Sequence, residues 1–252
     1  IKVSKLCNSN SKLPLKAELF VKFIANEILL GQCHFKLEDL YTKKESPLVD
    51  SESNEIGLLL FRHFHLAEKP GFLDYLRGGT ELNVMVAIDY TSSNEDKTNP
   101  VSLHAINKDG TPNEYEKAIK SVCEILLNYD MDKKVAMFGF GGKPHFPNYT
   151  SDSVSHCFNL TGTKDPYVQD LDGIIRTYRN SLDKVKLAGP TYFAPILKQA
   201  MKIAFDNKVN GSEEYLILLI LTDGEIHDME DSINCLIDSA ALPLSVIIVG
   251  VG

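Results

Sequence analysis

The sequence lacks both the long apolar run of a membrane-spanning helix and the basic excess of a nucleic-acid-binding protein. Spanning a bilayer takes about 18 or more apolar residues, and the apolar runs at residues 216–221 and 242–251 are short enough to be buried strands. Lysine and arginine number 26 against 34 aspartate and glutamate, a formal net charge of −8. This charge argues against nucleic acid as a partner. It leaves anionic lipid open if a bound cation bridges the two surfaces.

Paired cysteines are absent as well. The five cysteines are dispersed and form no C-x-x-C pair: Cys7, Cys33, Cys123, Cys157 and Cys235. An odd, dispersed set is typical of reduced thiols in a cytosolic protein. The chain begins at Ile1 without a methionine or a signal peptide and stops at Gly252 directly after a predicted strand, so we expect both ends to be truncated.

Residues 1–66 show strand patterns and no helix pattern. Apolar and polar residues alternate from Leu15 to Phe23, which predicts a half-buried antiparallel strand. Strand-like segments follow at residues 34–37 and 56–66, separated by the polar stretch 42–54. We therefore predict that residues 1–70 are the end of an all-β sandwich, too short to be a whole one. Residues 71–79 predict a linker, a short helix stopped by Gly78 and Gly79.

From Thr80 onward strands and helices alternate. The expected strands cover residues 82–88, 135–140, 154–160, 215–221 and 244–249, and expected helices cover residues 168–182, 193–205 and 229–239. A further helix is expected to start at a capping box of Thr111 and Glu114. Nearly all-apolar strands in this order predict an α/β fold for residues 80–252, a doubly wound, mostly parallel sheet covered on both faces. Ligands bind such sheets beyond the carboxyl ends of the strands, where the strand order reverses.

A carboxylate and two hydroxyls follow the first of these buried strands. Asp89, Thr91 and Ser93 come directly after the apolar run 84–88, and a spacing of two places them on one side of an extended turn. Mg²⁺ is a hard cation that prefers oxygen ligands at about 2.0–2.1 Å and keeps several waters. The pattern therefore predicts part of a metal-ion site.

Two later segments can complete this site. Thr191 follows the turn residues Gly189 and Pro190, and Asp223 follows the apolar run 216–220. An isolated Asp-x-Thr-x-Ser match carries little weight, because Asp, Ser and Thr at strand ends usually cap helices or close turns. The three segments in this order are much rarer, and they predict Asp89, Thr91, Ser93, Thr191 and Asp223 as metal ligands.

Other candidate sites are weaker. The glycines between residues 139 and 142 suggest a phosphate-binding loop. The pattern G-x-x-x-x-G-K-S/T is not met, because Met137 stands where glycine is required and Pro144 where serine or threonine is required. His63 and His65 would share one face of a strand without a third ligand, and His156 and Cys157 would point to opposite faces of a strand. Asp228 and Glu230 are interpreted as acids in the first turn of a helix. No catalytic pair emerges, so we predict that the chain is not an enzyme.

Residues 72–252 resemble the A domain of copines, a branch of the von Willebrand factor A-domain superfamily. The resemblance is carried by FLDYLRGG (72–79), VAIDYTSSN (86–94), SLH (102–104), FGFG (138–141), GPTYFAP (189–195) and LPLSVIIVGVG (242–252). Copines have two C2 domains followed by this A domain, so the resemblance implies that residues 1–70 are the C-terminal part of the second C2 domain. The metal-ion-dependent adhesion site of the superfamily maps onto Asp89, Thr91, Ser93, Thr191 and Asp223, with Thr91 where many A domains have serine.

The resemblance implies a calcium-dependent phospholipid-binding adaptor. Its A domain would hold Mg²⁺ or Mn²⁺ and bind partner proteins, and its C2 domains would bind anionic phospholipid membranes. The protein would be cytoplasmic and recruited peripherally to the plasma membrane when calcium rises. Copine C2 domains usually carry aspartates where residues 23–28 read FIANEI. We therefore expect the Ca²⁺ ligands to lie in C2 loops outside this chain.

Plant ubiquitin ligases of the RING type contain a similar copine-like A domain. Such a ligase would need a dense Cys/His cluster after residue 252, whereas a copine would need another C2 domain before residue 1. The β-rich first 66 residues favour the copine. Phosphoryl transfer at the metal site is a weaker hypothesis because no phosphate-binding loop accompanies the site.

Overall fold

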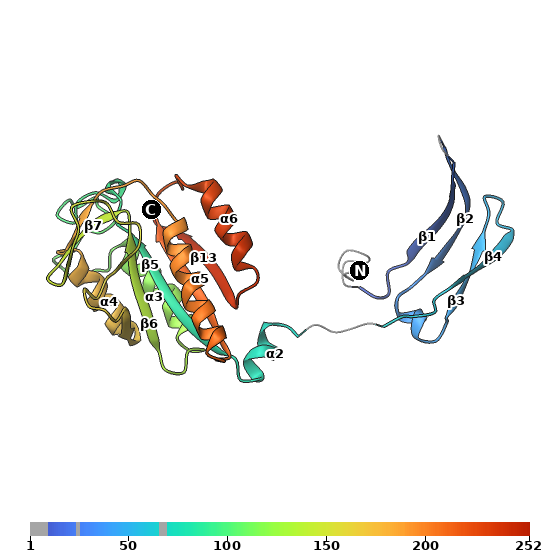
Figure 1. Ribbon diagram of the computed structural model, residues 1–252, viewed down its shortest axis with the longest axis horizontal. Helices are drawn as coiled ribbons and strands as arrows, with labels where there is room; N and C mark the ends of the chain where they lie inside the picture. The colour runs from blue at the N-terminus through green and yellow to red at the C-terminus, as the bar shows by residue number, and fades with distance from the viewer. Residues whose placement is uncertain (1–9, 24–25, 66–69) are drawn as a thin grey trace. The chain divides into compact units, whose positions relative to one another are not determined.

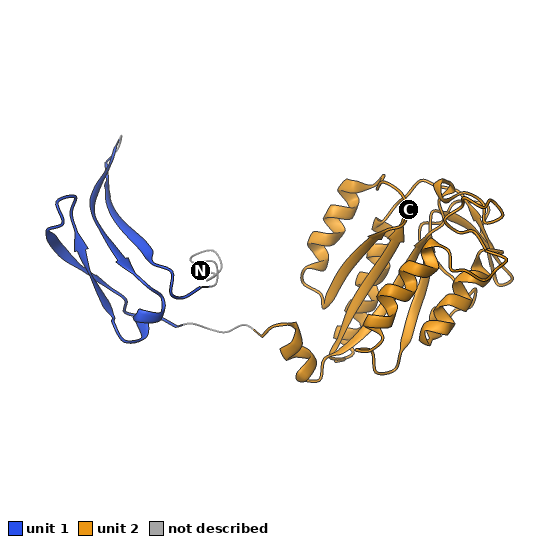
Figure 2. Cartoon of the chain, turned by 180° about the vertical axis from the view of Figure 1, so that it is seen from behind, with its two compact units in different colours: residues 1–69 blue, residues 70–252 orange. Residues whose placement is uncertain are grey.

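The computed structural model describes residues 10–23, 26–65 and 70–252. The chain divides into two compact units, residues 1–69 and residues 70–252 (Figure 2). The short helix α2 (Phe72–Arg77) belongs to the second unit. Among the described residues, no helix is both long and apolar enough to cross a membrane. The four described cysteines, Cys33, Cys123, Cys157 and Cys235, are free thiols, and Cys7 lies outside the described residues.

The first unit contains one antiparallel sheet. Its strands β1 (Leu15–Lys22), β2 (Glu27–Phe35), β3 (Glu45–Val49) and β4 (Glu55–Leu60) pair in chain order. The alternation of residues 15–23 correctly predicted β1. Strand β3 lies in the stretch expected to be a polar separator, because the buried Ser46 and Leu48 alternate with exposed neighbours. Strand β4 ends at Leu60, so His63 and His65 lie beyond it and the expectation of a shared strand face for them is wrong.

Only one layer of the expected sandwich is found in residues 10–23 and 26–65. No second sheet faces the first within this part of the chain. Leu37 and Leu40 form a small core, whereas Leu19, Phe20 and Leu58 are about half exposed. The all-β character of the unit is thus confirmed, and its C2 identity stays a prediction. Residues 24 and 25, within the segment 23–28 that lacks the usual copine aspartates, lie outside the described residues.

The second unit is built on a six-stranded sheet. Its main strands are β5 (Glu81–Asp89), β6 (Lys134–Phe140), β12 (Glu214–Thr222) and β13 (Leu244–Gly250), and neighbouring main strands run parallel. The order is β10-β6-β5-β12-β13, and the short strands β9 (Phe158–Asn159) and β10 (Tyr167–Gln169) run antiparallel to β6. The mostly parallel α/β sheet is confirmed. The strand expected at residues 154–160 is only the two residues of β9.

Helices cover both faces of this sheet (Figure 1). Strand residues Val84, Val86 and Ile88 pack against α3 (Glu114–Leu126) and α4 (Asp170–Ser181). The alternate residues Met85 and Ala87 pack against α5 (Ala194–Val209) and α6 (Met229–Ser239). Because successive strand residues point to opposite faces, a strand buried on both sides is apolar throughout. A separate small sheet contains β7 (Gly142–Phe146), β8 (Tyr149–Thr150) and β11 (Val185–Leu187).

The strand order reverses between β5 and β12. From β5 the chain first adds β6 on one side and later adds β12 and β13 on the other. Both strands are parallel, and Leu221 pairs with Ile88, so the segments that leave their carboxyl ends start side by side. Asp89 closes β5 and Asp223 follows Thr222, the last residue of β12. The predicted ligands therefore stand where this class of sheet binds ligands.

The capping box expected for the helix after the long loop was wrong by two residues. Helix α3 begins at Glu114, and Asn113 is its N-cap: Asn113 Oδ1 accepts from the amide of Glu116 at 2.9 Å, and Glu116 Oε2 accepts from the amide of Asn113 at 3.2 Å. Thr111 instead donates to Asp109 Oδ1 at 2.7 Å. Asn113 also donates to Ala105 O, which ties the cap to the preceding loop.

We expect Asn113→Ala to destabilise the chain by about 2 kcal/mol, since it removes a helix cap and leaves buried partners unsatisfied. Thr111→Ala, at an exposed position, should change the free energy of unfolding by less than about 0.5 kcal/mol. Urea unfolding of the two variants measures both values. Equal losses would show that Thr111 contributes to the cap.

Candidate metal-ion site

Asp89 is the centre of the candidate site. It ends β5, its side chain is completely buried, and each carboxylate oxygen has a partner. Asp89 Oδ1 accepts from the Thr91 amide at 2.7 Å, and Asp89 Oδ2 accepts from Thr222 Oγ1 at 2.5 Å. The hydroxyl of Thr222 thus joins the carboxyl ends of the two central strands through a carboxylate. Sequence reasoning did not single out Thr222, because its partner lies 133 residues away in the chain.

Three more of the predicted ligands are connected by hydrogen bonds. Thr91 Oγ1 and Ser93 Oγ are 2.9 Å apart, and Ser93 Oγ donates to Asp223 Oδ1 at 3.0 Å. Residues Ser92–Asn94 form a turn of 3-10 helix, so the extended geometry expected for the segment 89–93 ends at Thr91. The turn still keeps both hydroxyls together. Asp89, Thr91, Ser93 and Asp223 therefore form one continuous polar cluster.

Thr191 reaches the cluster from the loop before α5. A Cβ atom on Gly224 would lie 3.1 Å from Thr191 Oγ1, which places this hydroxyl against the residue that follows Asp223. The amide of His227 donates to Thr191 O at 2.9 Å. On the other side, the amide of Ser92 donates to Ala188 O at 2.7 Å. Backbone hydrogen bonds thus hold the loop between β11 and α5 to both strand-end loops, and this holds Thr191 in place.

The donor set fits a hard divalent cation. It consists of oxygen atoms only, two carboxylates and three hydroxyls, which are the ligands that Mg²⁺ and Mn²⁺ accept. Burial raises the pKa of Asp89, hydrogen bonds from Thr222 and Thr91 lower it, and the charge of Asp223 raises it further. Two carboxylates that disfavour each other's charge are stabilised by a cation between them. Among the described residues no group of three or more His, Cys, Asp or Glu side chains could hold a metal ion, so hydroxyls would have to complete this site.

Asn94 and Tyr115 support Asp223, and sequence reasoning missed both roles. Asn94 is buried, and its Nδ2 donates to Asp223 Oδ1 at 3.0 Å. Tyr115 OH in turn donates to Asn94 Oδ1 at 2.7 Å, which fixes the orientation of the amide. An asparagine one residue beyond the Asp-x-Thr-x-Ser segment was the available signal, but its contacts are not local in sequence.

His104 supports the backbone of Asp89. It is fully buried, and its Nε2 lies 3.0 Å from Asp89 O, so Nε2 carries the proton and donates. Nδ1 then accepts from Tyr178 OH at 2.8 Å, and Tyr178 OH accepts from Asn113 Nδ2 at 3.2 Å. The imidazole also stacks on Tyr115, with ring centroids 4.3 Å apart. Each of these residues thus donates a hydrogen bond to the next, from Asn113 at the cap of α3 through Tyr178 and His104 to the carbonyl of Asp89 at the end of β5.

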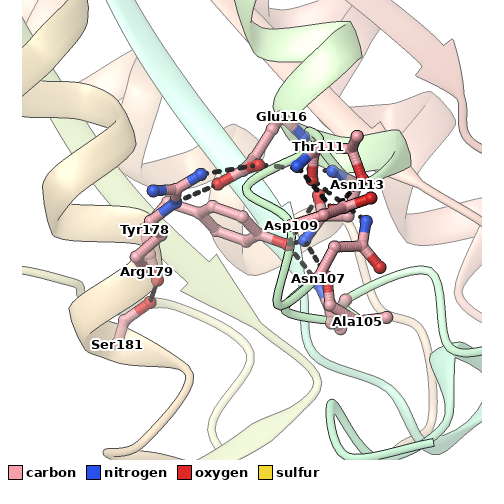
Figure 3. Close-up of polar contacts among 10 residues, drawn as sticks. Ala105, Asn107, Asp109, Thr111, Asn113, Glu116, Tyr178, Arg179 and Ser181 are labelled. Carbon is pink, nitrogen blue, oxygen red and sulfur yellow. Dashed lines mark hydrogen bonds and ion pairs between the residues drawn. The ribbon is translucent and has the colours of Figure 1, made fainter. Parts of the chain in front are cut away.

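The outer end of this series of hydrogen bonds is fixed by an ion pair between α3 and α4 (Figure 3). Arg179 Nη2 donates to Glu116 Oε2 at 3.1 Å, and Arg179 Nε donates to Glu116 Oε1. Glu116 is buried and also accepts from the amide of Asn113. The pair therefore connects the two helices to the N-cap that orients Tyr178.

The competing sites have structural roles. Gly139 packs against Phe158 and Tyr90, so the glycine-rich segment after β6 permits close packing of side chains. Burial raises the pKa of the Cys157 thiol to about 12, which keeps it protonated at neutral pH. Asp228 is more than the first-turn acid we expected: it is the N-cap of α6, and its carboxylate accepts from the amides of Phe193 and Ala194 at 2.9 and 2.8 Å.

The fold and the cluster define an α/β domain with a mostly parallel sheet and oxygen ligands gathered where its strand order reverses. The family model described as Copine matches residues 102–252. Protein BONZAI 1 of Arabidopsis thaliana is 45% identical over 182 residues, 72% of this chain and 31% of that protein. Copine-A of Dictyostelium discoideum is 32% identical over 262 residues, the whole of this chain and 43% of that protein. The chain belongs to the copine family.

Two further similarities complete the comparison. Nicotinic receptor-associated protein 1 of Caenorhabditis elegans is 38% identical over 229 residues, 90% of this chain and 35% of that protein. The crystal structure of the manganese-loaded Plasmodium vivax TRAP protein is similar with a TM-score of 0.42 and 13% identity, over 68% of this chain and 57% of that chain. A superposition this loose adds nothing to the assignment of the site. The chain spans about a third of the length of the BONZAI proteins that it matches.

The buried His104 makes stability depend on pH. Burial lowers its pKa to about 4 from the usual 6.5, so between these values the unfolded chain binds a proton that the folded chain does not. The stability due to neutral His104 is complete above pH 6.5 and falls as the pH drops towards 4. We expect a loss of about 2 kcal/mol between pH 7 and pH 5 from this group.

Urea unfolding at the two pH values measures this loss. His104→Gln should remove it, whereas His145→Gln, which changes an exposed histidine, should keep it. An unchanged pH dependence in His104→Gln would show that another group causes the effect.

Proposed function

We propose that this chain is part of a calcium-dependent phospholipid-binding adaptor of copine type. Its α/β unit binds Mg²⁺ or Mn²⁺ through Asp89, Thr91, Ser93, Thr191 and Asp223 and recruits partner proteins to membranes. The observation that carries the proposal is the hydrogen-bonded cluster of Asp89, Thr91, Ser93 and Asp223 at the ends of two neighbouring strands, in a chain of the copine family. The proposed role is binding and not catalysis.

The residues of the cluster supply two kinds of metal ligand. Asp89 and Asp223 supply negative charge, and Thr91, Ser93 and Thr191 supply neutral oxygens. Ser93 is exposed and Asp223 is half buried, so the cluster opens to solvent on their side, whereas Asp89 and Thr91 are closed off. A bound divalent ion supplies an open coordination position for an acidic group. We infer that a carboxylate of a partner protein approaches from the side of Ser93 and Asp223.

The first unit is proposed to be the end of a C2 domain. Its four antiparallel strands agree with this assignment, and its apolar side chains on the sheet would pack against the remainder of a sandwich. We propose that calcium binding and contact with anionic phospholipid belong to C2 loops outside this chain. The protein would then be cytoplasmic and move to the plasma membrane when calcium rises. The name of the Caenorhabditis elegans relative, nicotinic receptor-associated protein 1, supports a receptor as the kind of partner.

Removing the hydroxyl of Tyr115 should weaken metal binding. Tyr115→Phe leaves the Asn94 amide without the bond that orients it towards Asp223, and outer-shell changes of this kind cost about tenfold or more in metal affinity. Calorimetric titration with Mg²⁺ and with Mn²⁺ measures the effect. Tyr149→Phe, at a half-exposed tyrosine, should bind like the wild type. Equal affinities for both variants would contradict the role given to Asn94.

The membrane and partner functions can be separated in the full-length protein. We expect it to sediment with anionic phospholipid vesicles in Ca²⁺ and to stay in solution in EGTA. Asp89→Asn should leave this sedimentation unchanged and abolish Mg²⁺-dependent capture of partner proteins from cell extract. Calcium-independent sedimentation would contradict the membrane role. Capture by Asp89→Asn in EDTA equal to capture by the wild type in Mg²⁺ would contradict the metal-site mechanism.

A further inference from the structure

A second buried carboxylate lies in the turn between α3 and β6, and only half of it is satisfied. Asp130 is 3% exposed. Its Oδ1 accepts from the amide of Lys133 at 2.9 Å, whereas its Oδ2 is buried and has no hydrogen-bond partner among the described residues. A buried carboxylate oxygen without a partner is costly, because it has lost water and gained nothing in exchange. Something must neutralise it.

A second acid adds to this negative charge. Asp132 follows two residues later, and its side chain is about half exposed. Burial raises the pKa of Asp130, the hydrogen bond from the Lys133 amide lowers it, and the charge of Asp132 raises it further. Lys134 Nζ lies 3.6 Å from Asp132 Oδ2, with both side chains exposed to solvent. This exposed pair screens Asp132 and does not reach the buried oxygen of Asp130.

The end of α3 makes the same place favourable for a cation. The carboxyl end of a helix carries partial negative charge. The last turn of α3, which ends at Leu126, contains no basic residue, and two acids follow it at positions 130 and 132. Acids that follow a helix carboxyl end add to its negative charge, so this part of the chain favours a cation.

The other buried carboxylates described above differ from Asp130 in this respect. Asp89 receives hydrogen bonds on both oxygens, and Asp228, which is partly buried, receives them on both oxygens as well. Within the described residues, Asp130 Oδ2 is the buried carboxylate oxygen that has no partner. A full set of hydrogen-bond donors was therefore built for these two acids, as it was for the buried Glu116, and not for Asp130.

We propose that the turn 130–132 is a second cation site, which takes Ca²⁺ through the buried Oδ2 of Asp130 and the carboxylate of Asp132. Water would supply the remaining ligands, because the carbonyl oxygens of Glu124, Ile125 and Leu126 already accept hydrogen bonds. Ca²⁺ suits this turn better than Mg²⁺, because Ca²⁺ accepts six to eight oxygens in irregular geometry and Mg²⁺ demands a near-ideal octahedron. The site precedes β6, whereas Asp89 follows the parallel strand β5, so the two sites lie at opposite ends of the sheet, about 20 Å apart.

The test is a calorimetric Ca²⁺ titration of the 252-residue chain in the Asp89→Asn background, which removes the first site. We expect one binding event with a dissociation constant on the order of 10⁻⁴ to 10⁻³ M, typical of a site with few charged ligands. Asp130→Asn should weaken it at least tenfold, and Asp132→Asn should weaken it by a smaller factor. Asp109→Asn, which changes an exposed turn aspartate, should leave it unchanged.

Two results would overturn the proposal. One is the absence of Ca²⁺ binding to the Asp89→Asn chain at 10-fold excess over the expected constant. The other is an unchanged titration in Asp132→Asn, a variant at an exposed position that decides the matter even if Asp130→Asn does not fold. In either case a proton shared by Asp130 and Asp132 would be the neutralising group, and the stability of the chain would rise on acidification from pH 7.

Discussion

The structure depends on the burial of the Asp89 carboxylate between the ends of β5 and β12. A charged group without solvent is tolerated only where donors are fixed in place around it. The hydroxyl of Thr222 and the amide of Thr91 are such donors, and they come from the two strands whose order reversal opens the site. The same contacts that satisfy Asp89 therefore set the positions of the other ligands. The hydrogen bonds that stabilise the fold around Asp89 are thus the same ones that fix the geometry of the site.

Rigidity at this point is supplied by buried aromatic and amide side chains. His104 fixes the carbonyl of Asp89, Tyr115 and Asn94 fix the carboxylate of Asp223, and Tyr178 connects His104 to the cap of α3. The groups of this network are buried and already paired with one another, so a different arrangement would leave a buried polar group without a partner. This network also explains why α3 and α4 are paired through a buried glutamate. Loss of the Glu116–Arg179 contact would free the cap, and with it the orientation of Tyr178.

Sequence reasoning predicted well the parts of this structure that depend on local pattern. Continuous apolar runs predicted β5, β6, β12 and β13 within one or two residues, and helical spacing predicted α6 with its bounds. Asp89 and Asp223 were found because they follow such runs. The supporting residues were missed because their contacts span 15 to 133 residues, as with His104 and Thr222. The strands of the small sheet β7-β8-β11 are two to five residues long, too short for any period to appear.

Helix α3 extends between the two proposed cation sites, which lie at opposite ends of the sheet. Its first turn holds Tyr115, which supports the site at Asp223, and its last turn leads to Asp130. Coupling between distant sites requires an element with two arrangements that both sites bias. Helix α3 is fixed at its start by the Asn113 cap, along its length by the buried Ile119 and Cys123, and beside α4 by Glu116. An element held at so many points has one arrangement. A cation at the Asp130 end would therefore stabilise the whole α/β unit and leave the affinity at the Asp89 end unchanged.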